Sequence, residues 1–257
     1  MNYGIVELSV VPGREEASDA SEMVTQLLFG DTFSIIEEAE KFIKIIIHYD
    51  QYECWICKKQ YLPISKTEFT QISNSPYYCT TDLVQVISYK KNFLPIVQGS
   101  SLPHFNDGKF TIGKEEIEYD GNITVPAKIG TKSKIVEDAL MYLNAPYLWG
   151  GKSPFGIDCS GLSQIVYKIN NLVIPRDASQ QAELGLGYSF VEEAEAGDLA
   201  FFDNEEGIIT HVGILVGKNK IVHASGKVRI DTLDHHGIYN HETNNYSHKL
   251  RIIKNMF

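Results

Sequence analysis

The stretch GIDCSGLSQIVYKIN, residues 156–170, places a cysteine between an aspartate and a serine, where a turn gives way to a helical pattern. Apolar side chains recur behind it at positions 162, 165, 166 and 169, which predicts an amphipathic helix that begins near Cys159. Asp158 suits the capping position of such a helix. A helix N-terminus also stabilises a thiolate. Two interpretations therefore stay open at this point: a capped helix with a packed thiol, or a presented nucleophile.

The composition excludes several classes of protein. The 257-residue chain has 23 basic and 33 acidic side chains, a net charge of −10, which argues against nucleic acid or an anionic membrane as its partner. The sequence contains no run of 18 apolar residues, so no membrane-spanning helix is predicted. The start, MNYGIVELSVVPGREE, lacks the basic and apolar regions of a secretory signal. We therefore expect a cytoplasmic protein of undefined oligomeric state.

The cysteines are too few and too scattered for a disulfide framework. They stand at positions 54, 57, 79 and 159. Cys54 and Cys57 form a CxxC pair, which we interpret as ordinary strand cysteines, with metal or redox use as the alternative. No role is evident for Cys79, and no motif indicates a cofactor or a resident metal ion.

The first half of the chain has the pattern of small antiparallel barrels. The segments DTFSIIEE, KFIKIIIHY and YECWIC are short and rich in β-branched and aromatic residues. A second set follows in DLVQVISYK, FLPIVQG, KFTIG and EEIEYDG. We expect one barrel over residues 1–60 and another over residues 61–125.

From about residue 126 the pattern changes to helices followed by strands. SKIVEDALMYL and CSGLSQIVYKIN have helical periodicity, and PRDASQQAELG predicts a short helix capped by Asp177 and ended by Gly185. The strands GDLAFF, THVGILVG, KIVHASG, KVRIDT and HKLRIIK come next. This order predicts an α+β domain over residues 126–257.

Two histidines could activate Cys159. A nucleophilic thiol needs an imidazole as base, and the imidazole needs an orienting partner. His211 begins one predicted strand and His223 ends the next. We interpret the other six histidines as ordinary surface or core residues: positions 48, 104, 235, 236, 241 and 248.

The geometry of the predicted hairpin sets a condition on this pair. A two-residue loop at Lys218 and Asn219 would leave His211 and His223 on opposite faces. A three-residue loop or a bulge would place both imidazoles on one face. A catalytic pair therefore requires an odd-numbered loop or a bulge.

The motifs YLWGGKSPFGIDCSGL, THVGILVG and HASG, in this order, resemble those of the NlpC/P60 family of papain-like cysteine peptidases. The resemblance covers about residues 130–257, and the β-rich half resembles the bacterial SH3-type (SH3b) domains that often precede this catalytic domain. Together they resemble the γ-D-glutamyl-L-diamino acid endopeptidases, or dipeptidyl-peptidases VI, of cell-wall-peptide recycling. The implied architecture is a papain-like domain preceded by two small SH3-like barrels.

The resemblance implies a catalytic role for four residues. Cys159 is the nucleophile, His211 is the base, and His223 orients His211. Tyr147 matches a tyrosine whose hydroxyl helps to hold the oxyanion beside the Cys159 N–H. A histidine in the third place, instead of a carboxylate, implies modest charge assistance. The helix start and the imidazole together predict a thiol pKa below the usual value of about 8.5.

The resemblance also implies substrate contacts. Asp158 would bind the free amine of an N-terminal L-alanine through a charge-assisted hydrogen bond. Ser160, Trp149, Asp177 and Ala178 match positions that line the same pocket, although each has an ordinary structural explanation as well.

In relatives the first barrel lends an acid and a tyrosine to the same pocket. Glu22 and Tyr52 are the candidates here. Cys54 stands where a glycine normally precedes the tryptophan, so the identity of the tyrosine is open.

The implied substrate is L-Ala-γ-D-Glu-(L-Lys or meso-diaminopimelate), cut after the γ-linked D-glutamate, and the third residue is not specified by the sequence. One alternative is a general hydrolase of intact muropeptides. Another is a wall-binding SH3b protein with a vestigial catalytic domain, which the intact Cys-His-His set disfavours. A lipid-directed acyltransferase is also disfavoured, because those relatives carry the histidine before the cysteine.

Overall fold

The computed structural model describes residues 2–188 and 190–257, which form two compact units. The first unit comprises Met1–Lys128 and Trp149–Pro154, and the second comprises Ile129–Leu148 and Phe155–Phe257. The short loop from Trp149 to Pro154 therefore belongs to the first unit, although both of its chain neighbours belong to the second. Among the described residues, no helix is long and apolar enough to cross a membrane.

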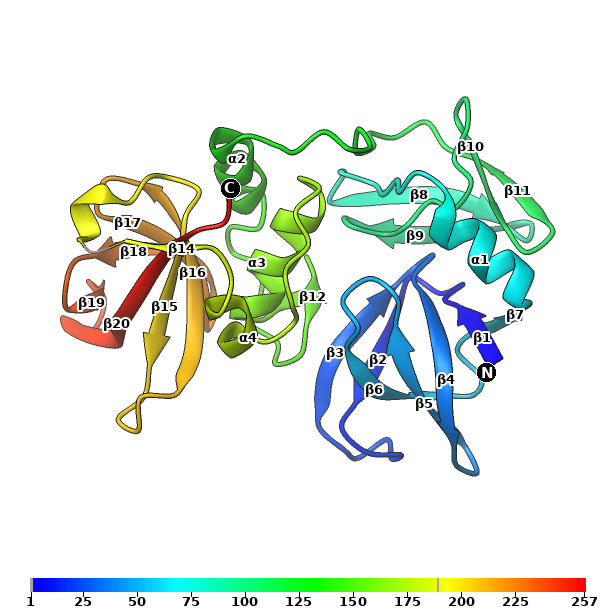
Figure 1. The fold of residues 1–257 in the computed structure, drawn as a ribbon, viewed down its shortest axis with the longest axis horizontal. Coiled ribbons are helices and arrows are strands. Elements are labelled where there is room, and N and C mark those ends of the chain that lie inside the picture. The colour runs from blue at the N-terminus through cyan, green and yellow to red at the C-terminus, as the bar shows by residue number, and fades with distance from the viewer. Residues whose placement is uncertain (1, 189) are drawn as a thin grey trace. The chain divides into compact units, whose positions relative to one another are not determined.

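A curled antiparallel sheet of seven strands opens the first unit (Figure 1). Its strands lie in the order β3 (Met23–Leu28), β2 (Val10–Arg14), β6 (Glu53–Cys57), β5 (Phe42–Ile47), β4 (Thr32–Glu38), β1 (Asn2–Ile5) and β7 (Leu62–Ile64). Ile43, Ile45 and Ile47 alternate along β5 and are all buried, as expected of a strand with one face on a core. Three of these strands were predicted from their β-branched runs, and β7 extends the sheet beyond residue 60.

The rest of the first unit differs from the barrel expected there. It contains one helix and two separate two-stranded sheets, at α1 (Lys66–Asn74), β8 (Val84–Tyr89), β9 (Asn92–Val97), β10 (Lys109–Ile112) and β11 (Glu115–Glu118). Ser65 caps α1 by accepting from the Glu68 N–H. None of the α1 residues is fully buried, but Phe69 and Ile72, three residues apart, pack against the core, and this single apolar pair was not recognised as a helical pattern. Since these strands do not join into one sheet, the prediction of a second barrel is not confirmed.

The CxxC pair lies on β6. Cys54 is buried and Cys57 is partly exposed. Because successive side chains of a strand point to opposite faces, residues three apart cannot converge on one metal ion. The structure thus agrees with the interpretation of ordinary strand cysteines.

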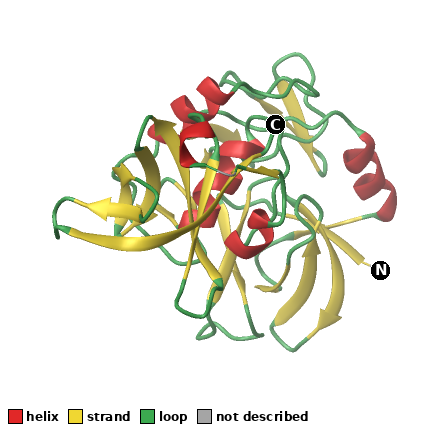
Figure 2. Ribbon diagram, turned by 60° about the vertical axis from the view of Figure 1, so that its left-hand side comes forward, coloured by secondary structure: helices red, strands yellow, loops and turns green. Residues whose placement is uncertain are grey.

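The second unit begins with helices and ends with strands, as predicted. Its helices are α2 (Lys132–Leu140), α3 (Cys159–Lys168), α4 (Ala178–Ala182) and a short 3₁₀ helix (Val191–Glu193). Every residue of α3 is buried, and this helix packs against α2 and against strand β16 (Ile209–Gly217). The short strands β12 (Lys152–Ser153) and β13 (Gly156–Ile157) precede α3 along the chain. Figure 2 distinguishes these few helices from the many strands.

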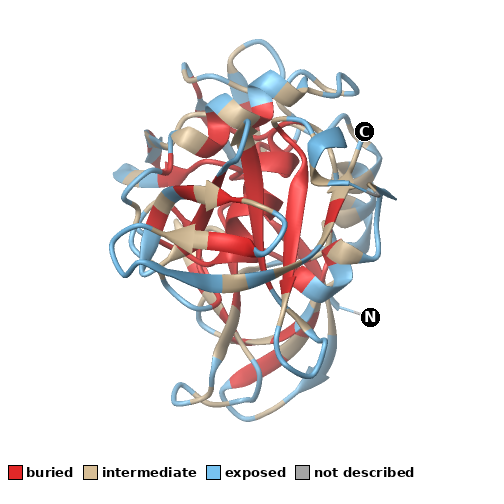
Figure 3. Ribbon diagram, turned by 90° about the vertical axis from the view of Figure 1, so that its left-hand side faces the viewer, coloured by how far each residue is buried: buried red, intermediate tan, exposed pale blue. Residues whose placement is uncertain are grey.

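The sheet of the second unit has seven antiparallel strands. Their order is β14 (Leu186–Gly187), β20 (Asn245–Asn255), β15 (Leu199–Asp203), β16, β17 (Lys220–Ser225), β18 (Lys227–Leu233) and β19 (Gly237–Asn240). The long strand β20 also pairs with β19. Phe201, Val212 and Val222 of the central strands are fully buried, and buried segments of this kind are red in Figure 3. The central strands therefore provide a rigid base for the polar residues that they carry.

Candidate active site

Cys159 is the first residue of α3, and local chemistry fixes the start of this helix. The Asp158 carboxylate accepts a hydrogen bond of 2.7 Å from the Gly161 N–H, which is the capping interaction expected from the sequence. The thiol is only 7% exposed. Backbone N–H groups of Val212 and Ser160 hydrogen-bond to its sulfur. Because Val212 follows His211 in β16, the sulfur lies against the strand that carries the predicted base.

The expectation of a low thiol pKa is wrong. Burial raises the pKa of Cys159 to about 11, and the charge of Asp158 raises it further, against smaller opposing effects of Val212, Arg176 and Ser160. Desolvation disfavours the charged form of any acid. Here it outweighs the helix N-terminus, so the resting group is a neutral thiol.

His211 and His223 lie on the same face of their hairpin because a bulge sets the register. Ile214 pairs with Val222, and the pairing shifts between Leu215 and Gly217 before the turn. The condition derived from the sequence is thereby met. His211 Nε2 lies 2.9 Å from His223 Nδ1.

A glycine makes room for this contact. A side chain at Gly213 would place its Cβ 2.7 Å from the Ile221 side chain and 3.0 Å from the His223 Cβ. Such distances are too short for any larger residue. Gly213 therefore lets the imidazole of His223 lie across β16.

Asp231 extends the pair into a series, and it was missed in the sequence. Its Oδ2 lies 3.0 Å from His223 Nε2, and its Oδ1 accepts from Arg229 Nη2 at 3.1 Å. Burial alone would raise the pKa of Asp231, but the hydrogen bonds from His223 and Arg229 outweigh burial and lower the pKa below its usual value. The carboxylate is therefore ionised. The expectation of modest charge assistance did not include this group.

An ionised carboxylate can only accept hydrogen bonds, and this fixes both tautomers. His223 donates its Nε2–H to Asp231, so its Nδ1 accepts the Nε2–H of His211. His211 then keeps a lone pair on Nδ1. Burial, with smaller effects of His248 and His223, holds the pKa of His211 well below its usual value, so His211 is a neutral base.

His248 also belongs to the site, which corrects its interpretation as an ordinary histidine. Its ring stacks on that of His211, with centroids 4.0 Å apart and planes inclined by 22°. Its Nδ1 lies 2.8 Å from the hydroxyl of Ser247. Burial, followed by an electrostatic effect of His223, lowers the pKa of His248 to about 4. The pairing of β20 with β15, of β15 with β16 and of β20 with β19 brings this residue to the site.

Tyr147 lies close enough to Cys159 for the two groups to interact electrostatically. Burial raises the pKa of Tyr147 to about 12, and the electrostatic effects of Cys159 and Asp158 contribute to the rise. The Tyr147 N–H donates to the Gly226 carbonyl at 3.1 Å. The phenol therefore stays protonated and can donate a hydrogen bond, while its role at an oxyanion stays a prediction.

Asp158 has a cationic partner that the sequence analysis did not identify. Arg176 is 2% exposed, and its Nη2 and Nη1 lie 2.5 and 3.1 Å from the two Asp158 oxygens. Arg176 Nη1 also donates to the Ser160 hydroxyl at 2.8 Å. The charge of Asp158 is thus already balanced, and both Asp158 and Ser160 are held rigidly.

The remaining predicted substrate residues are distributed over both units. Asp177 is the N-cap of α4 and Ala178 is its first residue, buried to 8% exposure. In the first unit, the Trp149 Nε1–H donates to Glu22 at 2.5 Å, and Tyr52 packs against the core of the curled sheet. Substrate binding by these residues stays a prediction.

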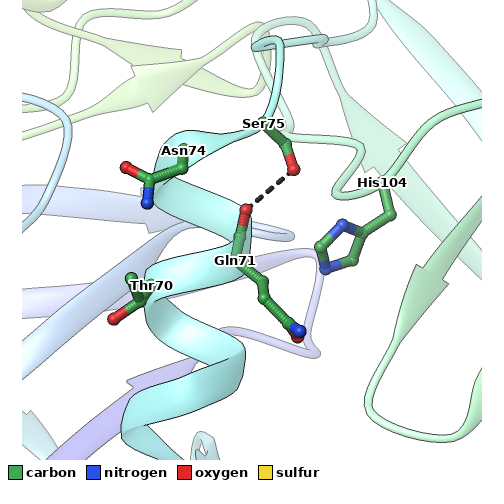
Figure 4. Close-up of a pocket in the computed structure, with 5 residues that line it drawn as sticks. All are labelled: Thr70, Gln71, Asn74, Ser75 and His104. Carbon is green, nitrogen blue, oxygen red and sulfur yellow. Dashed lines mark hydrogen bonds between the residues drawn. The ribbon is translucent and has the colours of Figure 1, made fainter.

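A separate hollow in the first unit lacks this chemistry. Thr70, Gln71, Asn74 and Ser75 of the α1 end line it together with His104 (Figure 4). The Ser75 hydroxyl donates to the Gln71 carbonyl at 2.7 Å. Its lining contains no thiol and no carboxylate, so the candidate active site is the one at Cys159.

Comparison with known proteins finds matches for both halves of the chain. The profile of the NlpC/P60 family matches residues 144–247, and that of the bacterial dipeptidyl-peptidase Sh3 domain matches residues 13–60. The chain is 32% identical over 213 residues to the gamma-D-glutamyl-L-lysine dipeptidyl-peptidase of Bacillus subtilis (strain 168), covering 78% of this chain and 71% of that one. It is 28% identical to the dipeptidyl-peptidase 6 of Lysinibacillus sphaericus, over 85% of this chain and 88% of that one.

A solved structure shares the fold over nearly the whole length. It is that of an NlpC/P60 family protein from Bacillus cereus ATCC 10987, with a TM-score of 0.84 at 20% identity, covering 99% of both chains. The architecture described above is therefore a recurrent one.

Proposed function

The chain belongs to the NlpC/P60 family of peptidases, and from this premise we propose that it is a cysteine peptidase of peptidoglycan stem peptides. It hydrolyses the γ-D-glutamyl–L-diamino acid bond of peptides with a free N-terminal L-alanine and releases L-Ala-γ-D-Glu. The observation that carries the proposal is the hydrogen-bonded series from Asp231 through His223 to His211, next in the chain to Val212, whose backbone N–H hydrogen-bonds to the Cys159 sulfur.

The first half of the reaction acylates Cys159. His211 Nδ1 takes the thiol proton as the sulfur attacks the γ-carbonyl carbon of D-glutamate. Because the resting thiol is neutral, proton transfer accompanies attack and does not precede it. The oxyanion accepts hydrogen bonds from the Cys159 N–H, which is free at the helix start, and from Tyr147. The imidazolium then protonates the departing amine of the diamino acid and leaves a thioester.

The second half of the reaction restores the enzyme. Water loses a proton to His211 Nδ1 and attacks the thioester carbon. The second tetrahedral intermediate collapses, the sulfur leaves and recovers the proton, and L-Ala-γ-D-Glu departs as the acid. Asp231 stabilises the imidazolium in both halves through His223, as an orienting carboxylate does in other hydrolytic triads.

Asp158 supports selection of a free amine. Its carboxylate is held by the Gly161 N–H and by Arg176, so it is fixed in place before substrate arrives. An ammonium group would be a second cationic partner for it. Because Arg176 already balances this carboxylate, blocking the amine does not leave Asp158 unpaired, and the cost is that of one charge-assisted hydrogen bond.

We assign the enzyme to cytoplasmic recycling of wall peptides. A peptide with a free N-terminal alanine has already been cut from its glycan, so an enzyme that selects it acts late in wall breakdown. A general hydrolase of intact wall would instead accept an acylated alanine.

The test compares five substrates by mass detection and kcat/KM. They are L-Ala-γ-D-Glu-meso-diaminopimelate, its L-lysine analogue, the N-acetylated form of each, and intact muropeptide. The loss of one charge-assisted hydrogen bond, about 1.5–3 kcal/mol, predicts a roughly 10- to 150-fold lower kcat/KM after acetylation. Equal values for free and blocked substrates would identify a general wall hydrolase. Hydrolysis by the Cys159→Ala variant at the rate of the unchanged protein would contradict the mechanism itself.

A further inference from the structure

Three histidines from three strands of the second unit converge. His211 comes from β16, His223 from β17 and His248 from β20. One ring nitrogen of each lies within 4.8 Å of the others, and no other such cluster of possible metal ligands occurs among residues 2–188 and 190–257. The proposed peptidase reaction uses only His211 and His223, so it does not account for the third imidazole.

In two of these rings, one nitrogen is hydrogen-bonded to an oxygen atom, as is typical of metal-binding histidines. His223 Nε2 is occupied by Asp231, and His248 Nδ1 is occupied by the Ser247 hydroxyl. A metal-binding histidine usually donates its second ring N–H to a carboxylate, carbonyl or other oxygen, which orients the ring. The nitrogens left for an ion are His223 Nδ1 and His248 Nε2, with His211 Nε2 only 2.9 Å from the former.

We propose that His211, His223 and His248 form an inhibitory site for Zn²⁺. Neutral imidazole is a preferred zinc ligand, and three of them leave a fourth tetrahedral position for water. Zn–N bonds of about 2.0–2.1 Å require nitrogens roughly 3.3 Å apart. The widest separation, up to 4.8 Å, must therefore close by about 1.5 Å when the ion binds.

Zinc at this site would stop the peptidase by changing a tautomer. An ion on His211 Nε2 displaces the proton that this atom donates to His223, and the neutral ring then carries its proton on Nδ1. Nδ1 is the nitrogen that must accept the thiol proton, so His211 can no longer act as a base. This consequence rests on the proposed function, whereas the binding of the ion does not.

Binding is tested on the full chain after chelation and desalting, with Zn²⁺ in calorimetry and Co²⁺ in absorption spectroscopy. We expect one ion per chain and visible Co²⁺ bands of a tetrahedral nitrogen–oxygen site. The Cys159→Ala variant should retain both. Loss of binding in that variant, or an intense sulfur-to-cobalt band that disappears in Cys159→Ala or Cys57→Ser, would place the ion on a thiolate and overturn the proposal.

Variants of the third ligand provide the decisive comparison. His248→Gln should weaken Zn²⁺ binding at least 10-fold, whereas His241→Gln, on the neighbouring turn, should leave it unchanged. If circular dichroism shows that His248→Gln does not fold, Ser247→Ala, which removes only the hydroxyl beside His248 Nδ1, should weaken binding by about 10-fold. Unchanged affinity in the folded variant would overturn the site.

The inhibition has a separate measurement. Zn²⁺ should abolish hydrolysis of the free tripeptide, EDTA should restore it, and the concentration for half inhibition should match the calorimetric dissociation constant. Hydrolysis that continues with the site saturated would overturn inhibition. A chain that binds Zn²⁺ but hydrolyses no stem peptide at all would instead contradict the proposed function and leave the binding result intact.

Discussion

His223 Nε2 lies 3.0 Å from the Oδ2 of Asp231, and the two residues occupy neighbouring strands that pair through His223 and Arg229. Asp231 is two residues beyond Arg229, so its side chain lies on the same face of the sheet. Through this contact a buried, ionised carboxylate acts on His211 indirectly, by way of His223. The orienting group of the site is therefore a histidine–aspartate pair and not a histidine alone.

Replacing Asp231 by asparagine should reduce kcat/KM by about 10²- to 10⁴-fold, the range of a disturbed acid–base group. The asparagine amide can donate to His223 Nε2, which reverses both tautomers and moves the proton of His211 onto Nδ1. In the dependence of kcat/KM on pH, the pH at which activity falls on the acid side should also shift, and a purely structural defect would not produce such a shift.

The matched control for this change is Glu242→Gln. Glu242 accepts from Arg229 Nη1 at 2.9 Å, so the substitution removes a carboxylate from the same arginine without altering the contact of His223. We expect near-normal kcat/KM for Glu242→Gln. Equal losses in the two variants would mean that Asp231 acts through Arg229 and not through His223.

The raised pKa of Cys159, about 11, predicts slow alkylation in acid. The thiolate is the reacting form. The rate constant for iodoacetamide should therefore rise about 10-fold per pH unit between pH 7 and 9. Mass spectrometry of the modified peptide separates this reaction from that of the partly exposed Cys57. A plateau already reached at pH 6 would show a preformed ion pair and refute the neutral resting state.

Tyr147→Phe should lower kcat by about 10- to 100-fold and leave KM nearly unchanged. The hydroxyl is expected to bind the oxyanion only as it forms, so its loss affects the transition state more than the bound substrate. Tyr142→Phe is a suitable control because that buried tyrosine on the same segment is expected to have a structural role only. A rise in KM at constant kcat would indicate a substrate contact instead.

His248 should make the fold sensitive to acid. Its pKa is about 4 when folded, against a usual value of about 6.5 when unfolded. Below pH 6.5 the unfolded chain therefore binds a proton that the folded chain does not, and stability falls as pH falls toward 4. The slope approaches ~1.4 kcal/mol per pH unit for each such histidine.

Urea unfolding in buffer with EDTA measures this slope, and the chelator keeps metal ions from contributing. His248→Gln should flatten the dependence between pH 6.5 and 4, and His241→Gln should not. An unchanged slope in His248→Gln would assign the acid sensitivity to other groups.

Much of the site follows from local sequence. Asp158 and the apolar residues behind it determine where α3 begins, and with it the position of Cys159, because capping and helical periodicity act within a few turns. The same holds for α4 and its cap Asp177. The condition on the hairpin also followed from strand alternation, and the bulge before Gly217 satisfies it. In contrast, α1 presents the pair Phe69 and Ile72 to the core and has no fully buried residue, and this short pattern was not recognised as a helix.

Other features of the site were decided by the tertiary structure alone, because they depend on strand order and burial. Asp231 reaches His223 through the pairing of β17 with β18. His248 reaches His211 because β20 pairs with both β15 and β19, and β15 pairs with β16. Arg176 meets Asp158 across the turn that follows α3. The pKa of Cys159 was misjudged for the same reason. A helix N-terminus is visible in sequence, but the desolvation that opposes it depends on atoms brought together from distant parts of the chain.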